Sequence, residues 1–330
     1  MSTNDINQNL TNLASPKIGT KIIEVSDDFF GEVSRMLDDK EPVFIEDKYD
    51  EHGKWMDGWE SKRRRDGGND WAIIELGSPG IITEIDIDTS FFTGNFPPFA
   101  SIEGLYSDQK PSKDSDWIEI LSKTSLKGDS GNKFKIESKT KVNFIKLQIF
   151  PDGGVARLRL FGEVKLNWDN YDNKNDLIEL SSLKLGGSIV AYNNAHYGDV
   201  SALLSHGRGK TMGDGWETRR RREPGNDWII IKLATKGLIK KIEIDTAHFK
   251  GNYPDQASVQ VSNFDKNKGL EEVINDSHNW KYILDKSKLQ ADNIHNYEVN
   301  DTSIKGVTHV RLNIYPDGGV SRLRIFGIKL

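Results

Sequence analysis

Cysteine is absent from the 330 residues, and this absence removes several kinds of chemistry. A chain without thiols forms no disulfide, has no thiolate nucleophile, and cannot bind zinc or an iron–sulfur cluster through cysteine. Excess positive charge is lacking too, because 45 basic and 50 acidic residues leave a formal net charge of −5. No window approaches the ~20 apolar residues that cross a bilayer, and residues 1–13 are polar, without the basic and apolar regions expected of a signal peptide. We therefore expect a cytoplasmic protein that binds neither nucleic acid nor membrane.

An internal repeat dominates what is present. Residues 57–97 match residues 214–254 at 24 of 41 positions without a gap, at an offset of 157. A second block, residues 144–162, matches residues 309–327 at 12 of 19 positions, at an offset of 165. The order of the blocks is kept, and the period is far longer than that of a solenoid repeat. The chain therefore consists of two homologous domains.

The changing offsets locate the insertions, and the polar stretch at residues 167–176 indicates the linker. We place repeat 1 at residues 17–163, a polar linker at 164–180, and repeat 2 at 181–330. Repeat 1 carries ten extra residues between Leu37 and Asp57, and repeat 2 carries eight extra between Ser258 and Pro316. Insertions that one copy tolerates and the other lacks are expected to be surface loops.

Within each repeat the hydrophobic period is two. Ile85 and Ile87 alternate with Asp86 and Asp88, as expected for a strand with one buried face. Short runs of this kind recur between turns rich in glycine, proline and aspartate, such as residues 151–154. Helical signal is confined to residues 30–37 and 197–204. The pattern predicts an all-β protein built of antiparallel sandwiches or barrels.

The first candidate for chemistry is a run of charges around two tryptophans, DGWESKRRR at residue 57 and DGWETRRRR at residue 214. One interpretation is an ion-pair network that holds a loop, because buried charges must be paired. The other is an arginine-rich pocket for a carboxylate or a similar planar anion, which a guanidinium binds through two parallel N–H donors. Acidic neighbours argue against a nucleic-acid site.

The second candidate is the pair Arg322 and Arg324, with its counterpart in repeat 1, Arg157 and Arg159. Strand alternation places both arginines of a pair on one face, about 7 Å apart at ~3.3 Å per residue. They are predicted to clamp an anion. The alternative is a solvated face, or ion pairs with Asp152 and Asp317.

The third candidate is an asymmetry between the repeats. His248 follows Asp245 and stands where repeat 1 has Phe91, and His196 stands where repeat 1 has Phe29. Imidazole is the usual side chain for proton transfer near neutral pH, so repeat 2 is predicted to hold the acid–base machinery. A packed aromatic role for each histidine is the alternative. A divalent metal held by His196, His248 and a carboxylate such as Asp245 also stays open, although no compact ligand motif such as HExxH occurs.

These strings together resemble the allantoicase family. The paired DGWExxRRR…DW motifs, the paired DTxxFxGNxP motifs and the ending YPDGGVSRLRIFG carry the resemblance from about residue 17 to residue 330. One departure is asparagine at positions 69 and 226, where the family often has histidine. The resemblance implies a tandem of jelly-roll β-sandwiches similar to galactose-binding-like domains. It also implies hydrolysis of allantoate to ureidoglycolate and urea in purine breakdown, by an allantoate amidinohydrolase.

Applied to this chain, the resemblance yields specific hypotheses. Arg220, Arg322 and Arg324 are expected to bind the substrate carboxylate, while Glu217 and Asp245 bind the ureido groups or the water and His248 transfers the proton. Loss of urea assisted by the remaining ureido nitrogen and direct attack by water are both open. We expect a homo-oligomer with no certain cofactor. The alternative function is a non-catalytic tandem β-sandwich that binds a carbohydrate or a small anion.

Overall fold

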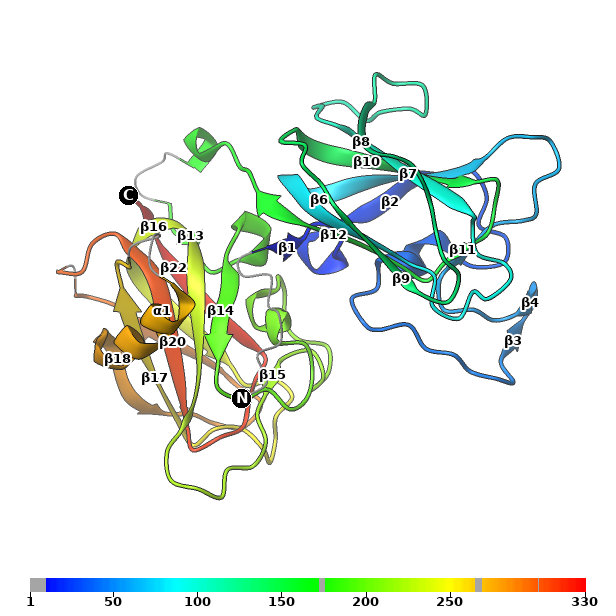
Figure 1. Cartoon of the computed structure of the whole chain (residues 1–330). Coiled ribbons are helices and arrows are strands. Elements are labelled where there is room, and N and C mark those ends of the chain that lie inside the picture. Colours follow the sequence, from blue (N-terminus) through cyan, green and yellow to red (C-terminus); the bar gives the residue numbers. More distant parts are fainter. Residues whose placement is uncertain (1–9, 172–175, 265–268, 302) are drawn as a thin grey trace. The chain divides into compact units, whose positions relative to one another are not determined.

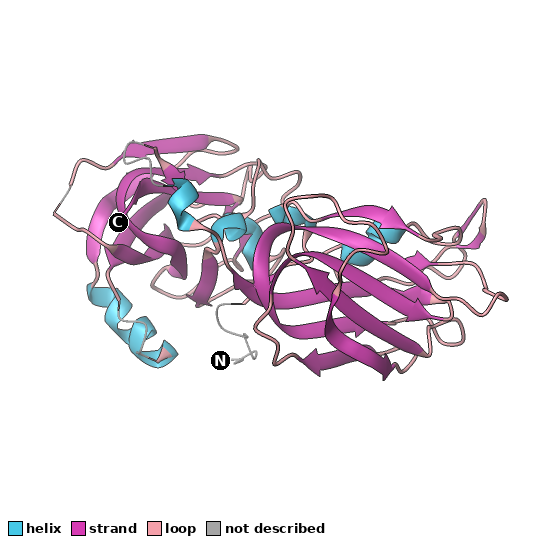
Figure 2. Cartoon of the chain, turned by 90° about the horizontal axis from the view of Figure 1, so that it is seen from above, coloured by secondary structure: helices cyan, strands magenta, loops and turns pink. Residues whose placement is uncertain are grey.

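A computed structural model describes residues 10–171, 176–264, 269–301 and 303–330. The described chain forms two compact units, residues 10–166 and 167–330, which we describe one at a time as repeats 1 and 2 (Figure 1). Strands dominate both units and short helical turns lie at their margins (Figure 2). In the described ranges, none of the helices has the length and apolarity that crossing a membrane requires.

Repeat 1 is built on one eight-stranded antiparallel sheet system, in the order β1-β12-β6-β10-β7-β8, with β2 and β9 also paired to β6. Two short ribbons, β3–β4 and β5–β11, complete it. The strands are β1 (Thr11–Asn12), β2 (Lys21–Val25), β3 (Tyr49–Asp50), β4 (Gly53–Lys54), β5 (Trp59–Glu60), β6 (Asp70–Asp88), β7 (Phe99–Leu105), β8 (Ile118–Ser125), β9 (Gly131–Lys135), β10 (Lys141–Phe150), β11 (Gly154–Val155) and β12 (Arg157–Val164). The 3-10 helices are η1 (Pro16–Ile18) and η2 (Val33–Leu37).

Repeat 2 has the same topology, in the order β13-β22-β16-β20-β17-β18, with β14 and β19 paired to β16 and a ribbon β15–β21. Its strands are β13 (Ile178–Glu179), β14 (Ser188–Tyr192), β15 (Trp216–Glu217), β16 (Asp227–Asp245), β17 (Gln256–Ser262), β18 (Lys281–Lys288), β19 (Ile294–Glu298), β20 (Val307–Tyr315), β21 (Gly319–Val320) and β22 (Arg322–Lys329). Its helices are η3 (Trp168–Tyr171), η4 (Leu183–Leu185), η5 (Val200–Leu204), α1 (Leu270–Asp276) and η6 (Ser277–Asn279).

In repeat 1 the 19-residue strand β6 joins the two layers of the sandwich. Its first half pairs with β2 and β10, and its second half pairs with β9 and β12, so the one strand belongs to both layers. Ile85 and Ile87 are fully buried, opposite Leu160 and Leu158 of β12 in the strand register. Strand β16 does the same in repeat 2. Alternation therefore sends one side of each strand into a core between the layers.

The all-β tandem predicted from the sequence is confirmed, and the two helical segments are short 3-10 helices in both repeats. The insertions are more structured than simple surface loops. In repeat 1 the extra residues form the exposed hairpin β3–β4. In repeat 2 they include α1, whose Val273 is buried in a cluster with Trp280 and Phe264. An apolar side chain on one face of a short helix is sufficient to dock it.

Candidate functional site

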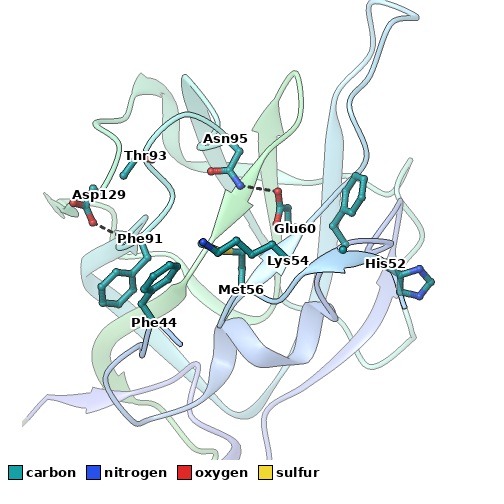
Figure 3. A pocket seen from close by; sticks show the side chains of 11 residues that line it. Phe44, His52, Lys54, Met56, Glu60, Phe91, Thr93, Asn95 and Asp129 are labelled. Carbon is teal, nitrogen blue, oxygen red and sulfur yellow. Dashed lines mark hydrogen bonds between the residues drawn. The ribbon is translucent and has the colours of Figure 1, made fainter. Parts of the chain in front are cut away.

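A cavity of about 570 Å³ opens at one end of the repeat 1 sandwich (Figure 3). The hairpin insertion, the ribbon strand β5 and the loop after β6 all contribute to its wall. The lining residues are Phe30, Phe44, His52, Gly53, Lys54, Met56, Glu60, Phe91, Thr93, Asn95 and Asp129. Several aromatic rings and a few convergent polar groups are typical of a small-molecule site.

Glu60 and Asn95 form the polar side of the cavity. Asn95 Nδ2 donates a hydrogen bond to Glu60 Oε1 at 2.7 Å, which Figure 3 shows as a dashed line. The local sequence directs Glu60 there, because the preceding Trp59 alternates to the opposite side and is completely buried. Burial raises the pKa of the Glu60 carboxyl, and the hydrogen bond from Asn95 partly opposes the rise. A half-buried carboxyl with a raised pKa can either donate or accept a proton.

Lys54 and two phenylalanines form the other side. The rings of Phe44 and Phe91 stack with centroids 5.8 Å apart, and Lys54 Nζ lies 4.6 Å from the Phe44 centroid. Figure 3 shows the Lys54 chain extended across the cavity between the rings and Glu60, whereas His52 points away from its centre. Both Phe44 and Lys54 come from the insertion, so a part of this wall has no counterpart in repeat 2.

The loops at the same end of repeat 2 repeat this geometry. Asn252 Nδ2 donates to Glu217 Oε1 as Asn95 does to Glu60. The Asp292 N–H donates to the Phe249 carbonyl oxygen at 3.1 Å, as the Asp129 N–H does to that of Phe92 at 3.2 Å. His248 thus occupies the position of Phe91, on the same side of the sandwich as Glu217. Glu217 and His248 therefore correspond to Glu60 and Phe91, which both line the repeat 1 cavity, and their joint role stays a prediction.

His248 is held by a backbone carbonyl. Its Nε2 lies 2.6 Å from the Gly209 carbonyl oxygen. Because a carbonyl only accepts, this bond requires the proton to be on Nε2. Nδ1 makes no hydrogen bond to any described residue, so its lone pair is left to take a proton. The half-buried ring is therefore oriented in one tautomer, as a general base requires.

Asp245 lies deeper than the sequence suggests. Its side chain is buried, and it accepts hydrogen bonds from the Ala247 N–H at 2.8 Å and from Arg208 Nε at 3.3 Å. Arg208 also contacts Asp292, 3.5 Å away. Asp245 therefore fixes the turn that carries His248 and anchors the loop that carries Arg208.

Arg322 is fully buried and tied to the protein. Its guanidinium donates to the carbonyl oxygens of Gly207, Asp214 and Ser321 and to the Asp214 carboxylate. Arg157 of repeat 1 has the same arrangement with Asp57. Asp317, the partner considered from the sequence, accepts instead from the Arg221 backbone N–H. Four of the five N–H donors of Arg322 are occupied, so a role in substrate binding would require it to release the loop.

Arg324 is similarly engaged. Nε donates to Glu243, Nη1 to Glu179, and Nη2 to the Gly207 carbonyl oxygen. Burial raises the pKa of Glu179, and the ion pair with Arg324 opposes that rise. The two arginines of β22 thus converge on Gly207 rather than on an open hollow, and their predicted role as an anion clamp stays a prediction.

Arg220 is exposed, and its repeat 1 counterpart Arg63 lines a different hollow of about 500 Å³ together with Lys62 and Arg65. The next arginine along the chain is structural in both repeats. Arg64 pairs with Asp66 and Asp70, and Arg221 with Glu223 and Asp227. The interpretation of the charged run as an ion-pair network therefore applies to Arg64 and Arg221.

His196, the other histidine considered as a metal ligand, is exposed and packs edge-on against Tyr197, with centroids 4.3 Å apart. Nε2 of His248 is already bonded to Gly209, and Asp245 to Arg208. Within the described ranges, no three histidine, aspartate or glutamate side chains cluster in a way that could hold a metal ion. The donor set around His196 and His248 therefore does not fit a metal site.

The sequence predictions passed over the residues of the repeat 1 cavity. No role was predicted for Glu60, Asn95 or Lys54, because the two histidines that lack a counterpart in repeat 1 pointed to repeat 2. The signal was available: glutamate and asparagine recur at an offset of 157 in both copies, and the ten-residue insertion occurs beside only one of them.

The sequence model of the allantoicase repeat matches residues 11–165 and 178–330. The chain belongs to the allantoicase family. A probable allantoicase of Burkholderia mallei is 48% identical over 96% of this chain and 94% of its own length. One from Photobacterium profundum is 47% identical over 96% of both.

A solved structure agrees with this family assignment. The crystal structure of allantoicase from Saccharomyces cerevisiae superposes with a TM-score of 0.83 at 34% identity, covering 97% of this chain and 94% of the yeast chain. Membership of the allantoicase family makes the chain a hydrolase with a small-molecule substrate. The tandem jelly-roll architecture implied by the resemblance is likewise that of an allantoicase.

Proposed function

We propose that the chain is an allantoate amidinohydrolase, which converts allantoate and water to ureidoglycolate and urea at the Glu217–His248 end of repeat 2. Family membership over both repeats supports the reaction. The fixed tautomer of His248 is the main observation that supports its location in repeat 2. In this reaction a bond forms between the water oxygen and the central carbon of allantoate. The bond from that carbon to one ureido nitrogen breaks, and this nitrogen receives a proton.

Glu217 and His248 divide the proton transfers. His248 Nδ1 takes the proton that water loses, because its lone pair is free and Nε2 is already a donor. Glu217, oriented by Asn252, accepts the N–H groups of the ureido substituents and, when protonated, donates to the departing nitrogen. Loss of urea assisted by the remaining nitrogen and direct attack by water need the same two proton transfers.

The substrate carboxylate needs a cation at this end of repeat 2. Lys250 is exposed and stands at the position of Thr93, which lines the repeat 1 cavity. We assign carboxylate binding to Lys250, and the exposed Arg220 predicted from the sequence is the second candidate for this role. Asp245, Arg322 and Arg324 act as positioning residues, since their contacts hold the 207–214 loop and thereby the Gly209 carbonyl that orients His248.

Urea release tests the proposal. The purified chain is incubated with allantoate, and urea is measured by a urease-coupled ammonia assay, with circular dichroism to show that the protein is folded. We expect urea and ureidoglycolate to form in equal amounts. Folded protein that releases no urea above the blank, with and without added Mn²⁺ or Zn²⁺, would contradict the proposal and favour a non-catalytic binding protein.

A further inference from the structure

The repeat 1 cavity takes no part in the proposed reaction, yet it has the composition of a ligand site. Its volume of about 570 Å³ lies within the range of ~300–1,000 Å³ that small-molecule sites occupy. Phe30, Phe44, Phe91 and Met56 supply apolar wall, and a small number of polar side chains face one another across it. Such a wall offers apolar contact to a ligand, beside the few polar groups that would fix its orientation.

Lys54 is the cation of this cavity. No carboxylate of the described residues pairs with Lys54, whose one recorded contact is the face of the Phe44 ring, 4.6 Å from Nζ. An ammonium over an exposed ring gains only ~0.5–1 kcal/mol, so it can exchange this contact for an anion without a large cost. A charge-assisted hydrogen bond to a carboxylate is the stronger interaction.

Glu60 and Asn95 offer the opposite chemistry. Asn95 uses its Nδ2 donor on Glu60 Oε1, which leaves the second carboxyl oxygen of Glu60 and Oδ1 of Asn95 as acceptors. Acceptors of this kind match the N–H groups of an amide or urea. A ligand that satisfies both sides therefore carries a carboxylate at one end and several N–H donors at the other.

The residue at the position of His248 decides what happens to such a ligand. It is Phe91, which cannot transfer a proton. We propose that the repeat 1 cavity binds, without cleaving, a small carboxylate that carries ureido groups, with Lys54 on the carboxylate and Glu60 on the N–H donors. The ligand class rests on the proposed function, and the site itself rests on the geometry of repeat 1.

Binding stoichiometry tests the second site. The probe is N-carbamoylglycine, a carboxylate whose single ureido group lacks the neighbouring nitrogen that assists departure, and equilibrium dialysis counts bound molecules per chain. We expect two per chain for the wild type and one for Lys54→Met. The matched control is Lys48→Met, because Lys48 lies in the same insertion, with Nζ 3.5 Å from the Trp55 centroid, and does not line the cavity. It should keep both.

A second variant guards against indirect effects. Glu60→Gln keeps the shape of the side chain and removes its charge, and we expect the affinity of the repeat 1 site to fall by roughly tenfold or more. Wild-type affinity and stoichiometry in either Lys54→Met or Glu60→Gln would overturn the assignment, as would a wild type that binds no probe. Failure of the proposed function looks different. The chain would then release no urea from allantoate, while the loss of one bound probe on Lys54→Met would remain measurable.

Discussion

The buried Arg322 and the half-buried Asp214, 108 residues apart in the chain, form an ion pair of 3.0 Å between Nη2 and Oδ2. Nη1 of the same guanidinium also donates to the Asp214 backbone oxygen at 2.8 Å. The pair ties the first residue of the DGWE motif to the first residue of β22, and Arg157 with Asp57 does the same in repeat 1 at 2.7 Å. In each repeat the first aspartate of the motif therefore fastens its loop to the start of the last strand.

Arg322→Met is expected to destabilise the protein by about 3 kcal/mol, because it leaves a carboxylate and three backbone oxygens without their donor. Chemical denaturation followed by tryptophan fluorescence measures the loss. The matched control is Arg219→Met, which removes an exposed arginine paired with Glu223 and should cost less than about 1 kcal/mol. Equal, small losses in both variants would show that the buried pair contributes little.

His309→Phe is expected to remove a pH dependence of stability. Burial among Phe264 and Trp280, with Lys232 nearby, lowers the pKa of His309 from 6.5 to about 4. Below pH 6.5 the His309 side chain therefore binds a proton in the unfolded chain, whereas in the folded chain it binds one only near pH 4. Stability falls as the pH drops through this window, by about 2 kcal/mol between pH 7.5 and pH 5.

The measurement is the free energy of unfolding of both proteins at the two pH values. Repeat 1 has Phe144 at the equivalent position, so the substituted side chain has a precedent in the same fold. Carboxyl groups titrate alike in the two proteins, and the difference between their pH dependences reports His309 alone. A variant that loses as much stability as the wild type on acidification would contradict the assignment.

His248→Phe is expected to lower kcat for urea release by roughly 10²–10⁴-fold, since a general base is removed. The change copies Phe91 of repeat 1 and keeps an aromatic ring at the site. His278→Phe is the control, because His278 is an exposed residue of η6 outside this end of the sandwich. Full turnover by His248→Phe would place the proton transfer elsewhere.

Gly154→Ala is expected to destabilise repeat 1 by about 1–3 kcal/mol through overpacking. A Cβ at residue 154 would lie 2.0 Å from the fully buried ring of Phe92. Gly94→Ala is matched to it, since a Cβ there meets nothing within 4 Å and the change should stay within ~0.5 kcal/mol. Thermal unfolding of the two variants side by side decides whether the close approach of β11 to Phe92 requires glycine.

Much of the fold could be predicted because strand alternation is local. Ile85 and Ile87 reveal a buried face without knowledge of their partners, and the duplication doubles every such signal. The arginines could not be assigned in this way. Alternation places Arg322 and Arg324 on one face, but whether their donors are free depends on Asp214, Glu179 and Gly207, more than a hundred residues away.

The candidate site, too, could be predicted from the sequence only in those features that depend on local residue identity and spacing. The sequence by itself determined the two repeats, their all-β character, the resemblance to allantoicases and the replacement of Phe91 by His248, because each is read from residue identity and spacing. Only the tertiary structure decided that the repeat 1 insertion forms the wall of a cavity, and that a carbonyl from a separate loop sets the tautomer of His248. These depend on the approach of distant segments, and short-range patterns carry no information about which groups meet there.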